Sequence, residues 1–427
     1  MVAPQGATEL TGTGATRSGR VVLVVGDFPK LSETFIVNKF LMLLNAGWDV
    51  HVVCDRSQPL EILPASMAIG LREVKTRVHC TWAHGSRSGR MIRWVVALAN
   101  CMLVNPSGTA RYFVLGFGRY KFGILKRFLS DARFIVLRPA IIHFEFGTSA
   151  IGRSTLKEAL SCKVVVSFRG YDLAHVGLER PDHYREVWDL ADTLHFLSNP
   201  FWEKALLRGC PPTKPHVRIP PAIDVRLFDH GGRTHTAMAG TKERPIRILS
   251  VGRLEWVKGY DYALVAVRIL LDQGLVCSYS IVGDGRYLDA VAFARRQLNL
   301  EDVVKILGSL RPDEIRAQMS DADVFLHAAV SEGFSNAVLE AQAMGLPVVC
   351  TDAGGLPENV VDGVTGFVVP RRDARAMAEK VRVRAADPML RQQFACAGRA
   401  RVLEEFQLPR QLHAFESLYY EVAKASN

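Results

Sequence analysis

The chain has 427 residues, about three times a typical domain length, so we expect two domains that each bury a core. Apolar residues make up 48% and charged residues 22%, a composition that excludes an intrinsically disordered protein. The formal net charge is +10, and residues 71–138 hold 13 basic and two acidic side chains while the rest of the chain is nearly neutral. The positive surplus therefore belongs to one segment.

Three further features limit the location and the ligands. Residues 1–18 are small and polar where a signal peptide needs an apolar segment, so we expect a disordered leader and a cytoplasmic protein. The most apolar stretch, residues 94–104, is too short to span a bilayer. The eight cysteines are scattered singly without a C-x-x-C pair, so we expect reduced thiols and no metal site.

The first half of the chain shows the alternation of a parallel α/β sheet. Residues 21–26 (VVLVVG) form a β-branched run that ends in glycine, as in a strand buried on both faces. A helix is predicted from Ser32, a candidate N-cap, to Gly47, and a second strand follows at residues 49–54. This order predicts a doubly wound domain over residues 19–228. Its further strands are predicted at residues 134–137, 140–146, 163–168 and 193–198.

The same alternation starts again after a polar, glycine-rich stretch at residues 229–245, which is predicted to be a linker. A second domain is expected over residues 246–405, followed by a C-terminal helix at 406–427 that packs back on the first domain. Its strands are predicted at residues 246–253, 277–285, 303–309, 323–329, 346–352 and 366–370. The predicted fold class is α/β, with two tandem Rossmann-like, doubly wound domains whose strand ends face a cleft.

A turn and helix in the second half are the strongest candidate for a binding site. Glu332 follows a predicted strand, and Ser335 or Asn336 can cap the helix after it. Free N–H groups at a helix start attract phosphate, so a pyrophosphate fits the N–H groups of Phe334 to Asn336. Glu340 lies eight residues after Glu332, which places a carboxylate on each side to accept hydrogen bonds from sugar hydroxyls. An ordinary amphipathic helix with two solvated glutamates has the same spacing.

A cationic turn, GRLEWVKG, follows the strand predicted at residues 246–253. It contains Arg253 and Lys258, which could clamp the same pyrophosphate and the charge that develops on a leaving phosphate. Two solvated basic side chains in a loop are the alternative.

Together these motifs resemble the retaining glycosyltransferases of family 4, which have the GT-B fold. The resemblance covers residues 246–410 and rests on the E-x7-E pattern of Glu332 and Glu340, the segments GLPVVCTDAGGLPE and VDGVTGFVVP, and the G-R-x4-K pattern of Arg253 and Lys258. It implies that Arg253 and Lys258 bind the donor diphosphate, that Glu332 contacts the donor sugar and that Glu340 holds the ribose. Backbone groups that would meet the sugar and phosphate belong to Gly333, Phe334, Ser335 and Asn336.

The first half resembles the exopolysaccharide glycosyltransferases of the colanic-acid type, through GDFPKLSETFIVNKF, IHFEFGT and SFRGYDL. In their H-x-H-F-G segment His143 matches the first histidine, and Glu145 replaces the second. In their F-H-G-x-D segment Arg169 replaces a histidine near the donor sugar. We expect His143 to be catalytic, and Arg169, oriented by Asp172, to bind the diphosphate or an anionic sugar. A core strand histidine and a structural Arg169–Asp172 ion pair are the alternatives.

The resulting hypothesis is a metal-independent transfer of a hexose, with retention, from a UDP- or GDP-sugar to a glycan or a polyprenyl-diphosphate-linked acceptor, in bacterial cell-surface polysaccharide synthesis. No metal or other cofactor is predicted. The DAD at residues 321–323 precedes a strand, and the GDG at 283–285 lacks the third glycine of a dinucleotide fingerprint.

The basic segment suggests where the acceptor is found. Arginines in residues 71–138 alternate with long apolar runs, which indicates contact with anionic lipid at the inner face of the cytoplasmic membrane, and no nucleic-acid motif is present. A solvated basic surface, a membrane- or nucleic-acid-binding protein on the same fold, and a nucleotide-sugar epimerase are the alternatives.

Overall fold

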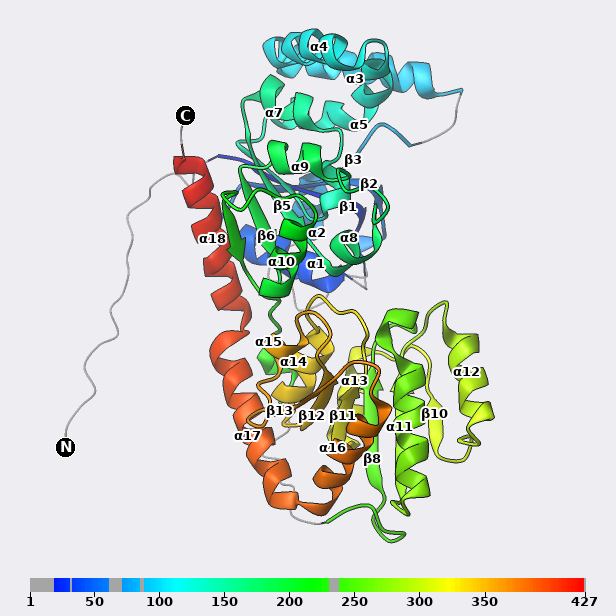
Figure 1. The fold of residues 1–427 in the computed structure, drawn as a ribbon. Coiled ribbons are helices and arrows are strands. Elements are labelled where there is room, and N and C mark those ends of the chain that lie inside the picture. Colours follow the sequence, from blue (N-terminus) through cyan, green and yellow to red (C-terminus); the bar gives the residue numbers. More distant parts are fainter. Residues whose placement is uncertain (1–18, 31–32, 61–70, 85–87, 230–237, 426–427) are drawn as a thin grey trace, which may run out of the picture.

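The computed structural model describes residues 19–30, 33–60, 71–84, 88–229 and 238–425. The predicted leader, the N-cap candidate Ser32 and residues 230–237 of the predicted linker lie outside these ranges. Two domains lie one above the other, each built on a parallel sheet with helices packed on it (Figure 1).

In the described residues of the first domain, seven parallel strands follow the order β3-β2-β1-β4-β5-β6-β7. The strands are β1 (Val21–Phe28), β2 (Val50–Ser57), β3 (Val78–Cys80), β4 (Ile141–Phe144), β5 (Lys163–Phe168), β6 (Thr193–Phe196) and β7 (His216–Arg218). The helices are α1 (Thr34–Asn45), α2 (Leu71–Arg77), α3 (Arg90–Val104), α4 (Pro106–Tyr120), α5 (Gly123–Leu137), α6 (Gly147–Ala150), α7 (Ser154–Leu160), α8 (Gly170–His175), α9 (Arg185–Leu190) and α10 (Asn199–Leu207).

One predicted strand is wrong. Residues 134–137 form the last turn of α5. The apolar side chains of Phe128, Ala132 and Ile135 recur at helical spacing and are buried in the core of the first domain. A four-residue apolar run has no period of its own, so its helical character is visible only with the residues before it.

The second domain has the same architecture. Across its described part, six parallel strands follow the order β10-β9-β8-β11-β12-β13, and all six predicted strands are confirmed. The strands are β8 (Ile246–Val251), β9 (Cys277–Val282), β10 (Val304–Ile306), β11 (Val324–His327), β12 (Val348–Thr351) and β13 (Gly366–Val369). The helices are α11 (Tyr260–Asp272), α12 (Leu288–Gln297), α13 (Pro312–Asp321), α14 (Asn336–Ala343), α15 (Leu356–Asn359), α16 (Ala374–Ala386) and α17 (Pro388–Glu405).

The last two helices run along one side of both domains (Figure 1). Helix α17 packs against α14 of the second domain, whereas α18 (Leu408–Lys424) packs against α1 of the first. Phe415, Leu418 and Tyr419 of α18 are buried in the same core cluster as β1. The indole N–H of Trp48 donates to Glu416 Oε1 at 2.9 Å. The C-terminal helices therefore tie the two domains together.

Each sheet reverses its strand order once, between β1 and β4 and between β8 and β11, and ligands of such sheets bind at the carboxyl ends next to this point. The loops after β5 and β6 contact the loop after β11, so these edges of the two sheets face each other. Among the described residues, none of the helices is long and apolar enough to cross a membrane.

Candidate active site

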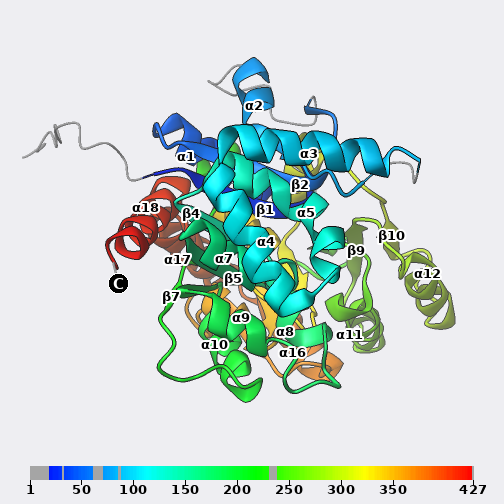
Figure 2. The same ribbon diagram turned by 90° about the horizontal axis from the view of Figure 1, so that it is seen from above.

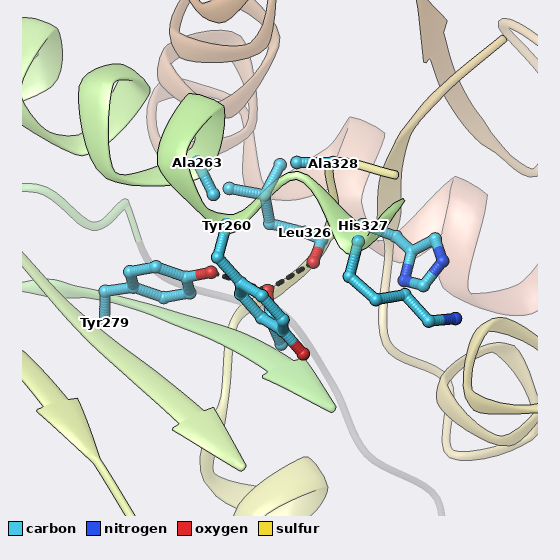
Figure 3. A pocket seen from close by; sticks show the side chains of 8 residues that line it. Tyr260, Ala263, Tyr279, Leu326, His327 and Ala328 are labelled. Carbon is cyan, nitrogen blue, oxygen red and sulfur yellow. Dashed lines mark hydrogen bonds between the residues drawn. The ribbon is translucent and has the colours of Figure 1, made fainter. Parts of the chain in front are cut away.

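Three ionisable side chains meet between the ends of β8 and β11. Lys258 closes a 3-10 turn after β8, His327 is the last residue of β11, and Glu332 lies in the loop that follows. Glu332 Oε2 accepts a hydrogen bond from Lys258 Nζ and lies 3.1 Å from His327 Nε2. Figure 3 shows His327 of this cluster and the nearby Tyr260 on α11, whose hydroxyl donates to Gly252 O at 2.8 Å. Lys258 and Glu332, predicted from separate motifs, are thus in direct contact.

The electrostatics of this cluster favour an ionised carboxylate. Burial disfavours the charge on Glu332, but the positive charge of Lys258 and the hydrogen bond from His327 outweigh burial and lower the pKa of Glu332 to about 2. Burial also lowers the pKa of His327, so this imidazole is neutral near pH 7. Near pH 7 Glu332 is therefore an ionised hydrogen-bond acceptor. Two donors hold it at the carboxyl ends of the strands of the second sheet.

A sharp turn after Lys258 holds its side chain against β11. Gly259 has a φ of 64°, and a Cβ at this position would lie 2.1 Å from the carbonyl oxygen of Ala328. The N–H of Val330 donates to Val257 O at 2.8 Å, so the turn and the loop that carries Glu332 touch backbone to backbone. Glycine is needed here for its conformation and for its small size.

Helix α14 begins where the sequence predicts, with Ser335 as its N-cap. The Ser335 hydroxyl accepts the N–H of Val338 at 3.4 Å. The N–H of Ser335 donates to Asn359 Oδ1 at 2.9 Å, so in this structure it is bonded within the protein, and the phosphate contact expected of it stays a prediction. The side chain of Phe334 is buried against Phe406, with ring centroids 5.5 Å apart, and leaves only its backbone for a ligand.

Two predicted donor-binding side chains keep unused hydrogen-bonding capacity. Glu340, on the second turn of α14, accepts no hydrogen bond at its carboxylate from the residues described, and burial raises its pKa to about 7. Arg253 is exposed and forms no side-chain hydrogen bond or ion pair with the described part of the chain. A ligand between them would find one acceptor and one cation.

The two domains touch at two glycines beside this site. A Cβ on Gly333 would lie 3.3 Å from Gly170 N, and a Cβ on Gly170 would lie 3.3 Å from Gly333 N. Ser198 Oγ donates to Gly333 O at 3.2 Å. The rings of His175 and Trp256 meet edge to face, 5.5 Å apart. The backbone after β11 is therefore positioned by both domains.

Arg169 lies at the end of β5, beside this contact, and its guanidinium is held by a residue other than Asp172. Its guanidinium donates to the backbone carbonyl of Glu145 at 2.9 Å and to Glu145 Oε2 at 2.7 Å, and it stacks on Phe35. Asp172 accepts the backbone N–H groups of Arg169 and Thr148, at 2.9 and 3.3 Å. The alternative prediction, a structural ion pair of Arg169 with Asp172, is therefore wrong. Glu145, which replaces the second histidine, binds the guanidinium instead.

His143 is fully buried in the centre of the first sheet. Its Nδ1 lies 2.7 Å from the hydroxyl of Tyr419 on α18, and its Nε2 lies 2.8 Å from Ser167 Oγ. Burial lowers its pKa well below the ordinary value. No substrate can contact this ring in the structure, so the expectation of a catalytic His143 is corrected to the alternative, a core strand histidine.

Three residues near these sites escaped the sequence analysis. His327 could have been found, because it closes a predicted strand five residues before Glu332. Lys39, buried and paired with Glu145, lies on a helix where a lysine ordinarily faces solvent. Asn359 returns from α15 to bond both backbone groups of Ser335, a contact that needs the tertiary fold.

Comparison with known proteins places the chain in a family. Residues 234–401 match the family model of the glycosyl transferases group 1. The amylovoran biosynthesis glycosyltransferase AmsK of Erwinia amylovora is 28% identical over 366 residues, 82% of this chain and 87% of that protein. The putative colanic acid biosynthesis glycosyltransferase WcaL of Escherichia coli K12 is 27% identical over 83% of this chain and 87% of its own length. Residues 234–401 therefore form a domain of the glycosyl transferases group 1, and the chain is a glycosyltransferase.

Solved structures confirm the GT-B fold of this glycosyltransferase. HepE from Anabaena, solved in complex with UDP-glucose, superposes with a TM-score of 0.69 at 15% identity and covers 94% of this chain and 100% of its own. Sucrose-phosphate synthase from Thermosynechococcus elongatus gives a TM-score of 0.68 at 18% identity, over 95% of this chain and 100% of its own.

The predicted site residues of the glycosyltransferase lie in both halves of the chain. Arg253, Lys258, Glu332 and Glu340 lie inside the segment that matches the family model. Arg169 lies outside that segment, and its neighbour Gly170 contacts Gly333.

Proposed function

We propose that this glycosyltransferase moves a hexose, with retention and without a metal ion, from a nucleotide diphosphate sugar to a lipid-linked glycan in exopolysaccharide synthesis. The Lys258–Glu332–His327 cluster carries the proposal, because it sets a cation and an ionised carboxylate beside a helix N-terminus. AmsK and WcaL are named for the biosynthesis of amylovoran and of colanic acid, which supports the pathway class.

The donor is proposed to lie on the second domain. Its diphosphate would contact Arg253, Lys258 and the N–H groups of Phe334 and Asn336, and its ribose would contact Glu340. The sugar would then lie against Glu332 and the backbone of Gly333. Lys258 and Arg253 stabilise the negative charge that develops on the departing diphosphate. The complex of HepE with UDP-glucose favours UDP as the first nucleotide to test.

The acceptor is proposed to enter from the first domain. A cavity of about 310 Å³ lies beside β1, β2 and α6 and is lined by both polar and apolar side chains. Its lining includes Asp55, Thr81, Ser149 and Arg153. Thr148, also in the lining, donates to Asp172, which caps α8 at the contact between the domains. Its polar side chains suit a hydroxylated ligand.

The test is a panel of nucleotide sugars incubated with the enzyme, with and without a lipid-linked glycan, and followed by product analysis. We expect one donor to be hydrolysed slowly alone and transferred with retained anomeric configuration when the acceptor is present, equally well in EDTA. Conversion of the donor to an isomer without acceptor would identify an epimerase and overturn the proposal.

Variants of the cluster sharpen this test. Lys258→Ala and Glu332→Ala should each lower transfer by about two to three orders of magnitude, the range for loss of a charge-stabilising donor or acceptor. Lys305→Ala and Glu301→Ala, at exposed positions of the same domain, are the matched controls and should retain full turnover. Near-normal transfer by both cluster variants would refute the assigned roles.

A further inference from the structure

Helix α3 presents an apolar face to solvent. Met91 is 73% exposed and Leu103 is 84% exposed. The exposed large apolar side chains recur at helical spacing and are Met91, Ile92, Val95, Val96, Met102, Leu103 and Val104. The opposite face holds the helix to the protein: Cys101 is buried, and the ring of Trp94 packs on Phe128 at 5.3 Å. Thus α3 is apolar on both faces, and only one of them is covered by the residues described.

This face lies at the end of the first domain. Helices α3 and α4 are the elements of that domain farthest from the second domain (Figure 1), and they are nearest to the viewer from above (Figure 2). Phe122, in the turn between α4 and α5, is 81% exposed and contacts Phe117, with ring centroids 6.1 Å apart. The apolar surface is therefore remote from the Lys258–Glu332–His327 cluster.

The charge around α3 has one sign. Residues 90–127 contain seven basic side chains and no acidic one. Arg119 is paired with Glu158, and Arg127 donates to Gly152 O. The side chains of Arg90, Lys121 and Lys126 are exposed and make no hydrogen bond or ion pair with described residues. These three cations are free to meet an anionic partner.

We propose that the outward face of α3, together with Arg90, Lys121 and Lys126, docks on the surface of a membrane that contains anionic lipids. Apolar side chains of an interfacial helix insert at the boundary between headgroups and acyl chains, and neighbouring cations bind the lipid phosphates. A second copy of the chain fits poorly, because the same cations would oppose each other across the contact. This membrane-binding surface is a proposal separate from the transfer reaction, since none of its residues was assigned a role in that reaction.

The experiment measures sedimentation of the full chain with two kinds of vesicle. One contains equal parts of phosphatidylglycerol and phosphatidylcholine, and the other contains phosphatidylcholine alone. Met91→Ser/Leu103→Ser should lower the partition coefficient for the anionic vesicles about tenfold or more. Arg90→Glu/Lys121→Glu should lower it by a similar factor and abolish its dependence on salt.

Leu207→Ser/Met389→Ser is the matched control, since both residues are exposed apolar side chains elsewhere on the surface. It should bind the anionic vesicles like the unaltered chain. Donor hydrolysis, measured without vesicles, should be equal in all variants and separates this result from failure of the proposed chemistry. Equal binding to both vesicles, unaltered binding by both test variants, or a dimer in solution that Met91→Ser/Leu103→Ser dissociates would overturn the proposal.

Discussion

Glu332 and Glu340 have the same side chain and opposite electrostatic surroundings. Lys258 and His327 keep Glu332 ionised, whereas Glu340 has only burial acting on it, and its pKa is raised to about 7. The difference follows from their partners, because a carboxylate removed from water without a cation favours its neutral form. If the two residues hold sugar and ribose as proposed, only the ribose contact titrates near neutral pH.

We expect the KM for the donor to rise about tenfold between pH 8 and pH 6, because the ionised fraction of Glu340 falls by that factor across a pKa of about 7. Glu340→Gln should have a KM that is nearly independent of pH in this window. Initial rates at varied donor concentration measure it, and Glu301→Gln serves as the control. A KM of the unaltered enzyme that does not change with pH would contradict the ribose contact.

Folding stability should respond to the same group. The folded-state pKa of Glu340 lies above its unfolded value, so ionisation opposes folding as the pH rises from about 4.5 through 7. Glu340→Gln removes this cost. Its melting temperature should therefore exceed that of the unaltered chain at pH 8 and match it at pH 4.

At the scale of elements, the turn from Trp256 to Lys258 and the loop after β11 form one unit. We expect Gly259→Ala to lower the melting temperature by several degrees and to lower transfer more than tenfold. Alanine is strained at a φ of 64°, and its Cβ would overlap Ala328 O, so the turn must move away from Glu332. Gly274→Ala is the control, because Gly274 also has a positive φ but an added Cβ there would contact nothing. It has the backbone strain without the displacement of the turn, and it should retain transfer.

The strands and the second-domain site were largely predictable from the sequence, because their signals are local. β-Branched runs marked most strands, and Glu332, Ser335 and Lys258 lie in motifs where few residues separate the groups. The failures were non-local. His143 is buried because Tyr419, 276 residues later, covers it. Arg169 pairs with Glu145 on the neighbouring strand, a choice that depends on how β4 and β5 pair.

At the scale of the whole molecule, stability of the first domain depends on the end of the chain. Leu418 on α18 is buried against β1, so Leu418→Ala should cost about 2–4 kcal/mol of unfolding free energy. Leu207→Ala, at an exposed position, should cost little. Denaturant unfolding followed by tryptophan fluorescence reports the loss, since Trp48 contacts Tyr419 and Tyr420. Equal stability of the two variants would show that α18 contributes little to this core.

The position of α18 also sets the order of events during synthesis. Strands β1 to β7 leave the ribosome before the second domain, but their sheet stays without its last covering helix until residues 408–424 have been made. An N-terminal domain usually completes its folding while the next domain is translated. The first domain of this chain cannot do so, because it lacks α18 at that stage. The first domain therefore reaches its final packing only after residues 408–424 have left the ribosome.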